Sequence, residues 1–394
     1  MTAMHEALAA GGTLDPVAWD TPERAALRRL AADFTRREIV PHLAGWEDAG
    51  ELPRSLHQAA AGLGLLGAGF PESLGGIEDP LASMHLTEAM IGAGASTGLI
   101  ASLFTHGIAL PSIVRYGTAD QQRRFVVPTL RGELIGALGV TEPDTGSDVA
   151  GLATRAVRDG DHYVVNGAKT YITSGVRADF VSTAVRTGGD GYGGISLLVV
   201  EKGTPGFTVS RRLDKMGWRC SDTAELTFQS ARVPSSNLVG EENLGVALIG
   251  GGFLSERIAM AAQAYSQGQR RLDLAAQWCR DRTTFGAPLI CRPSVQDTPT
   301  EMARRVDVAR TYTRSVADRS LEADLVAEVC FAKNTATETG QWVAHQAVRL
   351  FGGMGYKAES NVEQQYRDMR IMGIGGGAVE TLRQLAARSL GLTS

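Results

Sequence analysis

The stretch Val140-Thr-Glu-Pro-Asp-Thr-Gly-Ser-Asp148 tells more about the fold than any other part of the chain. The apolar run that begins at Leu138 leads into a loop of small and hydroxyl-bearing residues. Such loops present backbone N–H groups and hydroxyls at close range, which suits a phosphate or the polar edge of a flavin. By composition alone, an ordinary β-turn loop is the commoner explanation. No Gly-x-Gly-x-x-Gly follows a predicted strand, so the sequence does not support a Rossmann-type dinucleotide site.

Around this stretch, from Leu134 to about Glu241, apolar and polar residues alternate between turn-forming residues, which is typical of β-strands. Asn166-Gly167 stands between two such runs and is the strongest short hairpin pattern in the sequence, so it predicts a tight turn. Asp159-Gly160-Asp161 predicts another turn. We therefore expect a small antiparallel β domain over residues 135–242.

Both flanks of the β domain are expected to be helical. In Asp20-Thr21-Pro22-Glu23 a capping side chain, a proline and an acid follow one another as they do at helix starts. The predicted fold class is α+β, with an N-terminal helical domain (1–134), the central antiparallel β domain (135–242) and a C-terminal helical bundle (243–394). Apolar periodicity predicts helices at about residues 22–39, 52–66, 82–92, 97–116, 119–131, 254–282, 296–320, 321–352 and 380–390.

The composition is that of an ordinary globular protein, with 43% hydrophobic and 21% charged residues. The formal net charge of −4 provides no basic field for nucleic acid or an anionic membrane, and neither partner is expected. The 4 cysteines and 7 histidines show no metal-ligand spacing, so no metal site is predicted. No apolar run reaches the roughly 18 residues that span a bilayer, and no signal peptide is recognised. We expect a cytoplasmic protein.

Several motifs resemble those of one family. Val140–Asp148 is similar to the first signature of the acyl-CoA dehydrogenases, and other elements match the same family in the same order over about residues 20–390. By this resemblance the chain is identified as a member of the FAD-dependent acyl-CoA dehydrogenase family. The other matching elements are Tyr171-Ile-Thr173, Lys215-Met-Gly-Trp-Arg219, Arg282-Thr-Thr-Phe-Gly-Ala-Pro288, Gly352-Gly-Met-Gly-Tyr356 and Tyr366-Arg-Asp368.

The resemblance implies FAD as the cofactor and assigns residues to its site. Leu138–Thr141 and Tyr171–Thr173 would bracket the isoalloxazine ring, with Thr141 hydrogen-bonded to its edge and Tyr171 over one face. Arg282 would reach the FAD diphosphate of a neighbouring subunit, since a planar cation suits phosphate. The residues implied for the cofactor are Leu138, Gly139, Val140, Thr141, Ser147, Tyr171, Ile172, Thr173, Arg282, Arg349, Gly352 and Gly353.

Three positions depart from the family pattern, and all lie at the adenine and diphosphate end of the implied FAD site. Arg349 and Pro293 stand where glutamines are usual, and Ala378 stands in place of a threonine. Arg349 either strengthens the diphosphate contact or pairs with a nearby acid, and the sequence leaves both open. Pro293 and Ala378 each remove side-chain hydrogen bonding, so weaker binding of FAD is an open question.

The catalytic base is not at its usual position. Most family members carry a glutamate where this chain has Gly376, which has no side chain. Abstraction of a proton α to a thioester requires a carboxylate in a dry pocket. In a minority of the family, resembling isovaleryl-CoA and long-chain acyl-CoA dehydrogenases, the base lies upstream, and Glu256 matches that position.

An acid near a helix start is common, so Glu256 could instead interact only with the helix dipole or with Arg257. Loss of the usual glutamate favours Glu256 as the base, whereas Glu380 is interpreted as a helix residue. Gly376 keeps its backbone N–H, which in the family donates to the thioester oxygen. The residues implied for the substrate are Ser147, Arg257, Gly376 and Gly377.

The resemblance implies dehydrogenation of an acyl-CoA to the trans-2-enoyl-CoA, with electrons passed to an electron-transfer flavoprotein. It also implies a homo-oligomer, with a tetramer expected, because FAD sites in this family are shared between subunits. Two alternatives stay open on the sequence. One is a flavin oxidase or monooxygenase on the same fold, and the other is a non-catalytic subunit that binds acyl-CoA or FAD.

Overall fold

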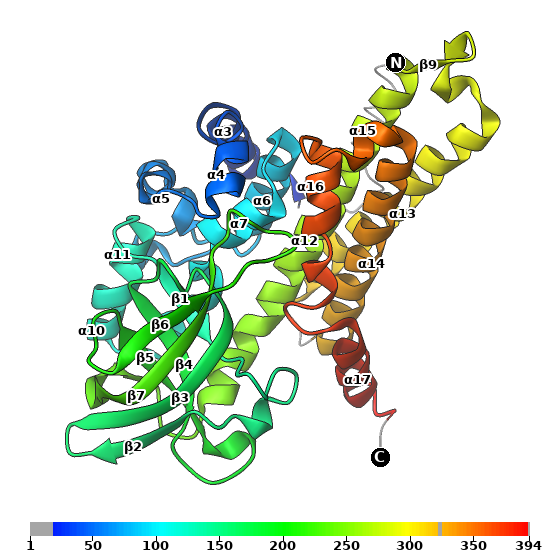
Figure 1. The fold of residues 1–394 in the computed structure, drawn as a ribbon. Helices are drawn as coiled ribbons and strands as arrows, with labels where there is room; N and C mark the ends of the chain where they lie inside the picture. The colour runs from blue at the N-terminus through cyan, green and yellow to red at the C-terminus, as the bar shows by residue number, and fades with distance from the viewer. Residues whose placement is uncertain (1–18, 322–324, 393–394) are drawn as a thin grey trace. The chain divides into compact units, whose positions relative to one another are not determined.

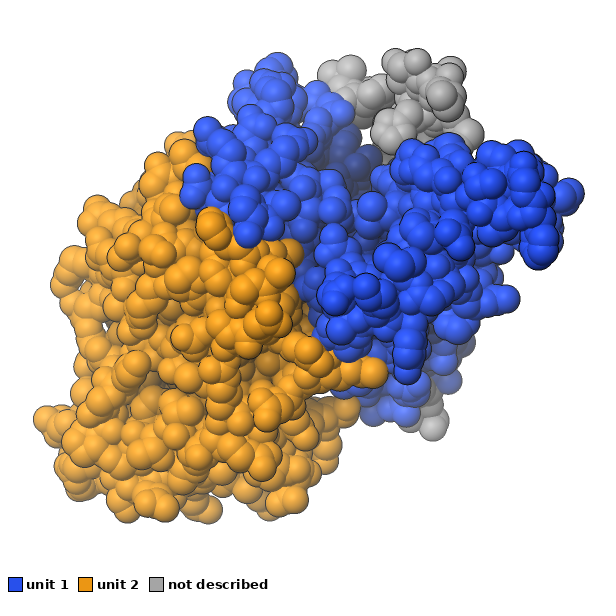
Figure 2. All heavy atoms as spheres, turned by 45° about the horizontal axis from the view of Figure 1, so that its top comes forward, with its two compact units in different colours: residues 1–41, 80–97, 257–394 blue, residues 42–79, 98–256 orange. Residues whose placement is uncertain are grey.

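The computed structural model describes residues 19–321 and 325–392. The chain divides into two compact units, which Figure 2 colours separately. Unit 1 comprises residues 1–41, 80–97 and 257–394, and unit 2 comprises residues 42–79 and 98–256. Each unit therefore combines segments that lie far apart in the sequence.

Unit 2 contains an eight-stranded sheet (Figure 1). The strand order is β6-β7-β3-β2-β4-β5-β8, and β1 pairs with β4 beside this path. Most neighbours are antiparallel, as predicted, but β1 and β2 each pair with β4 in parallel. The strands are β1 (Gly136–Gly139), β2 (Arg155–Asp159), β3 (His162–Thr173), β4 (Phe180–Arg186), β5 (Ile195–Glu201), β6 (Phe207–Arg212), β7 (Thr223–Pro234) and β8 (Leu238–Val239).

The centre of the sheet is covered on both faces. All seven residues of β4 are buried, including the polar Ser182, Thr183 and Arg186, so this strand does not alternate between a buried and an exposed face. On one face Tyr163 and Phe228 belong to a core of side chains from β3, β4, β5 and β7. On the other face Phe180 packs against Phe125, with ring centroids 5.0 Å apart. The two cores hold β1 and β3 in place, and these strands carry the predicted cofactor residues.

The hairpin predicted at Asn166-Gly167 is wrong. Both residues lie inside β3, which runs without a turn from His162 to Thr173, and the chain reverses instead at Gly160, between β2 and β3. A side chain on Gly167 would come within 2.7 Å of the Thr154 backbone, so close packing of two segments requires glycine here. The Asn166 side chain accepts the Ser230 N–H, at a shift in the pairing of β3 with β7.

Unit 2 also contains short helices. The single helix predicted over residues 97–116 is three helices, α7, α8 and α9, and the last has Pro111 at its first position. Pro111 cannot donate the backbone hydrogen bond that would continue a longer helix. The helices that begin in this unit are α4 (Leu43–Ala49), α5 (Arg54–Gly62), α8 (His106–Ala109), α9 (Pro111–Tyr116), α10 (Ala119–Gln121) and α11 (Val127–Leu130), and α7 (Thr97–Leu103) begins at its boundary.

Unit 1 is mainly helical in the part that the structure describes, with one short two-stranded hairpin at residues 283–288. Thr21 caps α3, as predicted, by accepting the Arg24 N–H at 3.3 Å. One apolar core joins four of its helices through Leu272, Met302, Val343 and Val362. The helices are α3 (Pro22–Phe34), α6 (Ala82–Ala93), α12 (Gly245–Asp281, shared with unit 2), α13 (Pro293–Arg319), α14 (Val326–Phe351), α15 (Gly353–Tyr356), α16 (Asn361–Asp368) and α17 (Val379–Ser389).

The helix predicted to begin near Leu254 begins at Gly245. Three consecutive glycines, Gly250 to Gly252, have poor helix propensity, and they concealed this part of α12 in the sequence. Packing overrides propensity here, because Leu248 and Ile249 are buried in the core of unit 2. By length and composition α12 would be able to cross a membrane, a property that core helices of folded proteins share.

Candidate active site

The stretch that opened the sequence analysis forms a tight loop at the end of β1. The N–H of Thr170 donates to the carbonyl of Thr141 at 2.9 Å, so this segment continues the course of β1 beside β3. Glu142 and Thr145 then exchange two backbone hydrogen bonds, of 2.9 and 3.2 Å. The Thr145 hydroxyl also donates to the carbonyl of Gly151. The loop is therefore held by its own backbone, with Ser147 exposed on it.

Tyr171 is presented to the surface by a β-bulge. The pairing of β3 with β7 shifts between Lys169 and Ile172, and Tyr171 has a left-handed φ of 58°. Bulges re-aim side chains, and in regular alternation Tyr171 would face the same way as Lys169. Instead, Lys169 is fully buried and Tyr171 is 70% exposed. A large aromatic ring is thus held outside the core beside the Thr141 segment.

Two hydroxyls next to this ring are available for a ligand. Thr141 and Thr173 are half-buried, and neither hydroxyl makes a hydrogen bond with any residue that the structure describes. A planar aromatic face together with unused hydroxyl donors suits a flat, polar-edged ring such as isoalloxazine. The residues present therefore fit the cofactor that the sequence motifs imply.

Glu256 lies on α12 and lines a small cavity within unit 2 that Leu138 also lines. The cavity has about 10 Å³ of space for the centre of a water molecule, roughly what one water needs. The Ser112 hydroxyl at its wall donates to the carbonyl of Leu248 at 3.1 Å. Glu256 is the ionisable side chain among the lining residues, which are Ile108, Pro111, Ser112, Leu138, Ile249, Gly252, Phe253 and Glu256.

The position of Glu256 on its helix argues against the helix dipole as the explanation for this acid. Glu256 follows the first residue of α12, Gly245, by about three turns. Interaction with the positive end of a helix dipole falls off within the first turn. Glu256 is therefore not a first-turn acid, contrary to the alternative considered from sequence.

In unit 1, the segment at Gly376 and Gly377 is bound by two cations. Arg257 Nε donates to the Gly376 carbonyl at 3.3 Å, and Lys333 Nζ donates to the Gly377 carbonyl at 2.8 Å. Both glycines have left-handed φ angles, of 63° and 99°. A side chain on Gly377 would come within 2.8 Å of Leu382. The backbone that replaces the usual glutamate is thus held in one conformation by its neighbours.

The residues predicted for the FAD diphosphate lie on exposed parts of unit 1. Arg282 follows α12 and precedes a two-stranded hairpin, β9 (Thr283–Thr284) and β10 (Ala287–Pro288), whose tip carries the 99% exposed Phe285. Arg349 is exposed and donates to the side-chain oxygen of Gln346 at 2.9 Å, an amide rather than an acid.

Gly352 and Gly353 are also exposed, and they lie where α14 gives way to α15. Of the departures from the family pattern, Pro293 begins α13 and Ala378 precedes α17 without a side-chain cap.

Comparison with known proteins agrees with this arrangement. Three family models match in succession: the acyl-CoA dehydrogenase N-terminal domain (residues 21–133), middle domain (137–231) and C-terminal domain (243–391). A probable acyl-CoA dehydrogenase of Bacillus subtilis is 35% identical over 374 residues, covering 94% of this chain and 98% of the relative. The long-chain specific acyl-CoA dehydrogenase of Rattus norvegicus is 35% identical over 372 residues, covering 93% and 86%.

A solved structure shows the same fold. The chain superimposes on a putative acyl-CoA dehydrogenase from Mycobacterium smegmatis with a TM-score of 0.93 and 61% sequence identity, covering 96% of this chain and all of that one. Helical segments before and after a β domain define the fold class, and the three family models define the family. The chain belongs to the acyl-CoA dehydrogenase family, whose members are FAD-dependent enzymes.

The structure brings some of the predicted site residues together and adds others. Within unit 2, Glu256 shares a cavity with Leu138, and the Thr141 segment lies beside β3, which carries Tyr171. Sequence analysis missed Lys169 and Lys333, which contact the backbone of the predicted site residues. Nothing in the sequence singled out either lysine, since β3 carries other polar residues beside Lys169.

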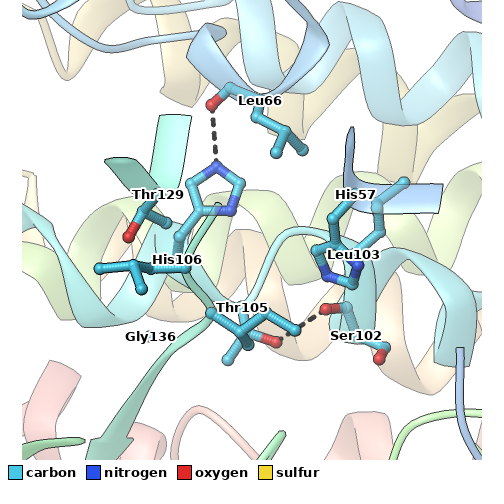
Figure 3. Close-up of a pocket in the computed structure, with 10 residues that line it drawn as sticks. His57, Leu66, Ser102, Leu103, Thr105, His106, Thr129 and Gly136 are labelled. Carbon is cyan, nitrogen blue, oxygen red and sulfur yellow. Dashed lines mark hydrogen bonds between the residues drawn. The ribbon is translucent and has the colours of Figure 1, made fainter. Parts of the chain in front are cut away.

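A second small cavity in unit 2 contains two buried histidines (Figure 3). His106 donates its Nε2–H to the carbonyl of Leu66 at 2.8 Å. Burial lowers the pKa of His106 to about 4, against the effect of this hydrogen bond. Burial, with the positive charges of Arg177 and His106, lowers the pKa of His57 to about 3. Both rings are therefore neutral in the folded protein at any ordinary pH.

These histidines predict that the protein loses stability in mild acid. The unfolded chain takes up protons below about pH 6.5, whereas the folded pKa values are depressed, so stability falls as the pH decreases from 6.5 toward 4. Each histidine contributes a slope of about 1.4 kcal/mol per pH unit. Urea unfolding at pH 7.5 and 5.5 measures the slope. His57→Phe should remove one histidine's contribution to the pH dependence of stability. Substitution of the exposed His345 by glutamine should leave that pH dependence unchanged. An unchanged slope in His57→Phe would contradict the prediction.

Proposed function

We propose that the protein dehydrogenates an acyl-CoA thioester to the trans-2-enoyl-CoA, with Glu256 as the base that removes the α-proton. The observation that carries the proposal is the shared cavity: Glu256 and the cofactor-site residue Leu138 line the same small space. The usual position of the base holds Gly376, which cannot accept a proton. Most of the other residues around the cavity are apolar, as a carboxylate that must act as a base requires.

The chemistry asked of these residues is limited. Bound FAD supplies the acceptor for the hydride that leaves the β-carbon. The Glu256 carboxylate takes the proton from the α-carbon, and its mostly apolar surroundings disfavour the water that would compete for that proton. The Gly376 N–H is proposed as a hydrogen-bond donor to the thioester oxygen, where negative charge develops. The left-handed backbone at Gly376, held through its carbonyl by Arg257, would keep this donor in place.

Residues for FAD are proposed on the same basis. Thr141 would donate to the edge of the ring and Tyr171 would cover one face, in agreement with the unused Thr141 hydroxyl and the exposed Tyr171 ring. Arg282, Arg349, Gly352 and Gly353 are proposed for the diphosphate. An electron-transfer flavoprotein as the acceptor, a homotetramer and a cytoplasmic location are further parts of this proposal, and they rest on the family resemblance and the composition.

The test is anaerobic bleaching of the flavin absorbance by a panel of acyl-CoAs. The panel includes straight, branched and aromatic acyl groups, since family members with an upstream base include isovaleryl-CoA and long-chain enzymes. We expect at least one class to bleach the flavin and the product to be the trans-2-enoyl-CoA. Slow return of colour in air, and rapid return with an electron-transfer flavoprotein, would support a dehydrogenase. Protein with bound FAD that no acyl-CoA bleaches would overturn the proposal.

A further inference from the structure

A buried ion pair contacts the peptide that is assigned to the edge of the flavin ring. Lys169 Nζ and Glu142 Oε1 are 2.7 Å apart, and their side chains are 0% and 6% exposed. Neither group takes part in the chemistry proposed above. Burying two charges is costly unless they are paired and further hydrogen-bonded, so the contacts of this pair decide what it can do.

The contacts of the pair converge on the cofactor loop. Lys169 Nζ donates to the Val140 carbonyl at 3.1 Å as well as to Glu142. The Glu142 carboxylate accepts the backbone N–H groups of Ala153 and Thr154, at 2.7 and 2.9 Å. The two side chains thus join β3, the end of β1 and the segment that leads into β2. Apart from this pair, no ionisable side chain takes part in these hydrogen bonds.

The pair is charged near neutral pH. Burial lowers the pKa of Lys169 to about 8, against the opposing effect of Glu142. Burial alone would raise the pKa of Glu142, but the Lys169 ammonium and the hydrogen bonds to Glu142 lower it overall. A positive and a negative charge therefore lie within hydrogen-bonding reach of the Val140–Glu142 backbone.

Because a peptide unit is planar, the contact between Lys169 and the Val140 carbonyl also orients the next backbone N–H group. The described residues contain no cis peptide, and in a planar trans peptide the C=O and N–H groups point in opposite directions. Because the Val140 carbonyl faces buried Lys169, the Thr141 N–H faces away from it. The Thr141 carbonyl is fixed separately, by the Thr170 N–H. Lys169 thereby determines where the Thr141 N–H points.

We propose that Lys169 is a positioning residue for FAD, which holds the Val140–Thr141 peptide so that the Thr141 N–H is a fixed donor to the cofactor, and that Glu142 balances its charge. This inference rests on the assignment of Val140 and Thr141 to the FAD site within the proposed function. Reduction makes the flavin more negative, so the two charges of the pair should act on its midpoint potential in opposite directions.

The inference is tested with FAD binding and flavin potential rather than turnover. FAD is removed, the apoprotein is titrated with FAD, and the midpoint potential of the reconstituted protein is measured. Lys169→Met should raise the Kd for FAD by about tenfold or more, because the peptide loses a charged hydrogen-bond donor. It should also lower the midpoint potential, since Glu142 is left without its counter-charge. Glu142→Gln should raise the potential, since the ammonium is left unbalanced.

Lys215 provides a matched control. Its Nζ also donates to a backbone carbonyl of unit 2, that of Ser221 at 2.6 Å, but not to the loop at Val140. Lys215→Met should reduce stability and leave the Kd and potential unchanged. Lys169→Met that folds with unchanged Kd and potential would overturn the inference. If Lys169→Met does not fold, the midpoint potential of Glu142→Gln is the test. An unchanged or lowered potential in Glu142→Gln would then overturn the inference. Failure of the wild-type protein to bind FAD would instead overturn the proposed function.

Discussion

Glu256→Gln is expected to bind FAD and acyl-CoA normally while its flavin is reduced at least about a hundredfold, and up to about ten-thousandfold, more slowly than in the wild-type protein. Glutamine matches glutamate in shape, so the small cavity shared with Leu138 keeps its lining. An amide cannot accept the α-proton, and no second carboxylate lines that cavity among the residues that the structure describes. Stopped-flow measurement of anaerobic flavin bleaching gives the rate directly.

Glu380 provides the control for this prediction. It is exposed in the first turn of α17, four residues beyond Gly376, and it is the other acid near the usual position of the base. Glu380→Gln should bleach at the wild-type rate. Bleaching at the wild-type rate in Glu256→Gln would remove Glu256 as the base, and a slow rate in Glu380→Gln alone would transfer the assignment to Glu380.

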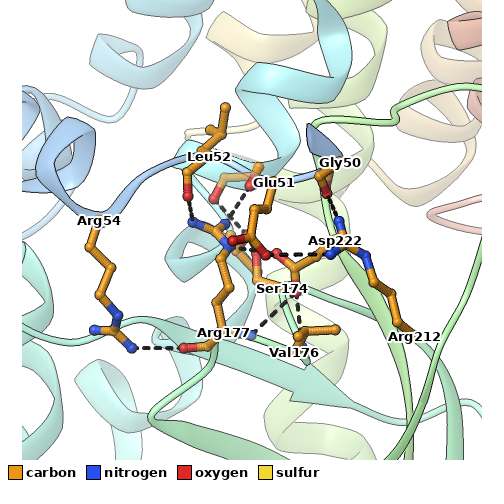
Figure 4. A network of polar contacts seen from close by, with 12 residues as sticks. Gly50, Glu51, Leu52, Arg54, Ser174, Val176, Arg177, Arg212 and Asp222 are labelled. Carbon is orange, nitrogen blue, oxygen red and sulfur yellow. Dashed lines mark hydrogen bonds and ion pairs between the residues drawn. The ribbon is translucent and has the colours of Figure 1, made fainter. Parts of the chain in front are cut away.

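Arg177→Met is expected to cause the largest loss of stability, about 3–5 kcal/mol. Arg177 is 8% exposed and donates to Asp222 at 2.6 Å, to the Leu52 carbonyl at 2.8 Å and to the Ser102 hydroxyl at 2.6 Å (Figure 4). Asp222 also accepts the N–H of Val176 at 2.9 Å. Loss of the guanidinium would leave a buried carboxylate without its counter-charge, in a unit that carries the predicted cofactor loop.

Thermal unfolding measures this effect, at about 2–4 °C per kcal/mol for a unit of this size. Arg211→Met is the matched control, because Arg211 pairs with Glu225 at 3.0 Å but is 65% exposed. An exposed pair contributes at most about 1 kcal/mol, so this variant should unfold close to the wild-type temperature. Equal losses of stability in Arg177→Met and Arg211→Met would contradict the prediction that a buried ion pair contributes more than an exposed one. Replacement of Arg177 and Asp222 together by apolar residues should recover part of the loss.

The sequence predicted the fold class and the motif-bearing loop because both depend on local patterns. Alternation of apolar residues marked the β domain, and Thr21 with Pro22 marked the start of α3. Two of the failures share one physical cause, which is contact between distant segments. Asn166-Gly167 favours a turn in isolation, but Gly167 lies in β3 because Thr154 packs against it. The glycines before Leu254 disfavour a helix, yet burial of Leu248 and Ile249 extends α12 through them.

In the candidate site, too, local motifs were predictable and contacts between distant segments were not. A motif position identified Glu256 as a candidate base from the sequence. The cavity that Glu256 lines and its distance from the start of α12 could not be predicted. Lys169 was not predicted, because its role depends on β3 lying beside the Val140 loop. Lys333 was not predicted either, because it lies 44 positions before Gly377, the residue whose carbonyl it contacts. Side chains that act on backbone far away in sequence leave no local pattern.

The left-handed backbone at Gly376 and Gly377 disfavours a glutamate at the position that carries the base in most of the family. A glutamate restored at Gly376 would have to adopt a φ of 63°, which costs a residue with a side chain about 1–2 kcal/mol. Arg257 and Lys333 hold the two carbonyls in the conformation that imposes this cost. A variant with a glutamate at Gly376 should therefore lose stability unless the contacts of Arg257 and Lys333 with this backbone also change.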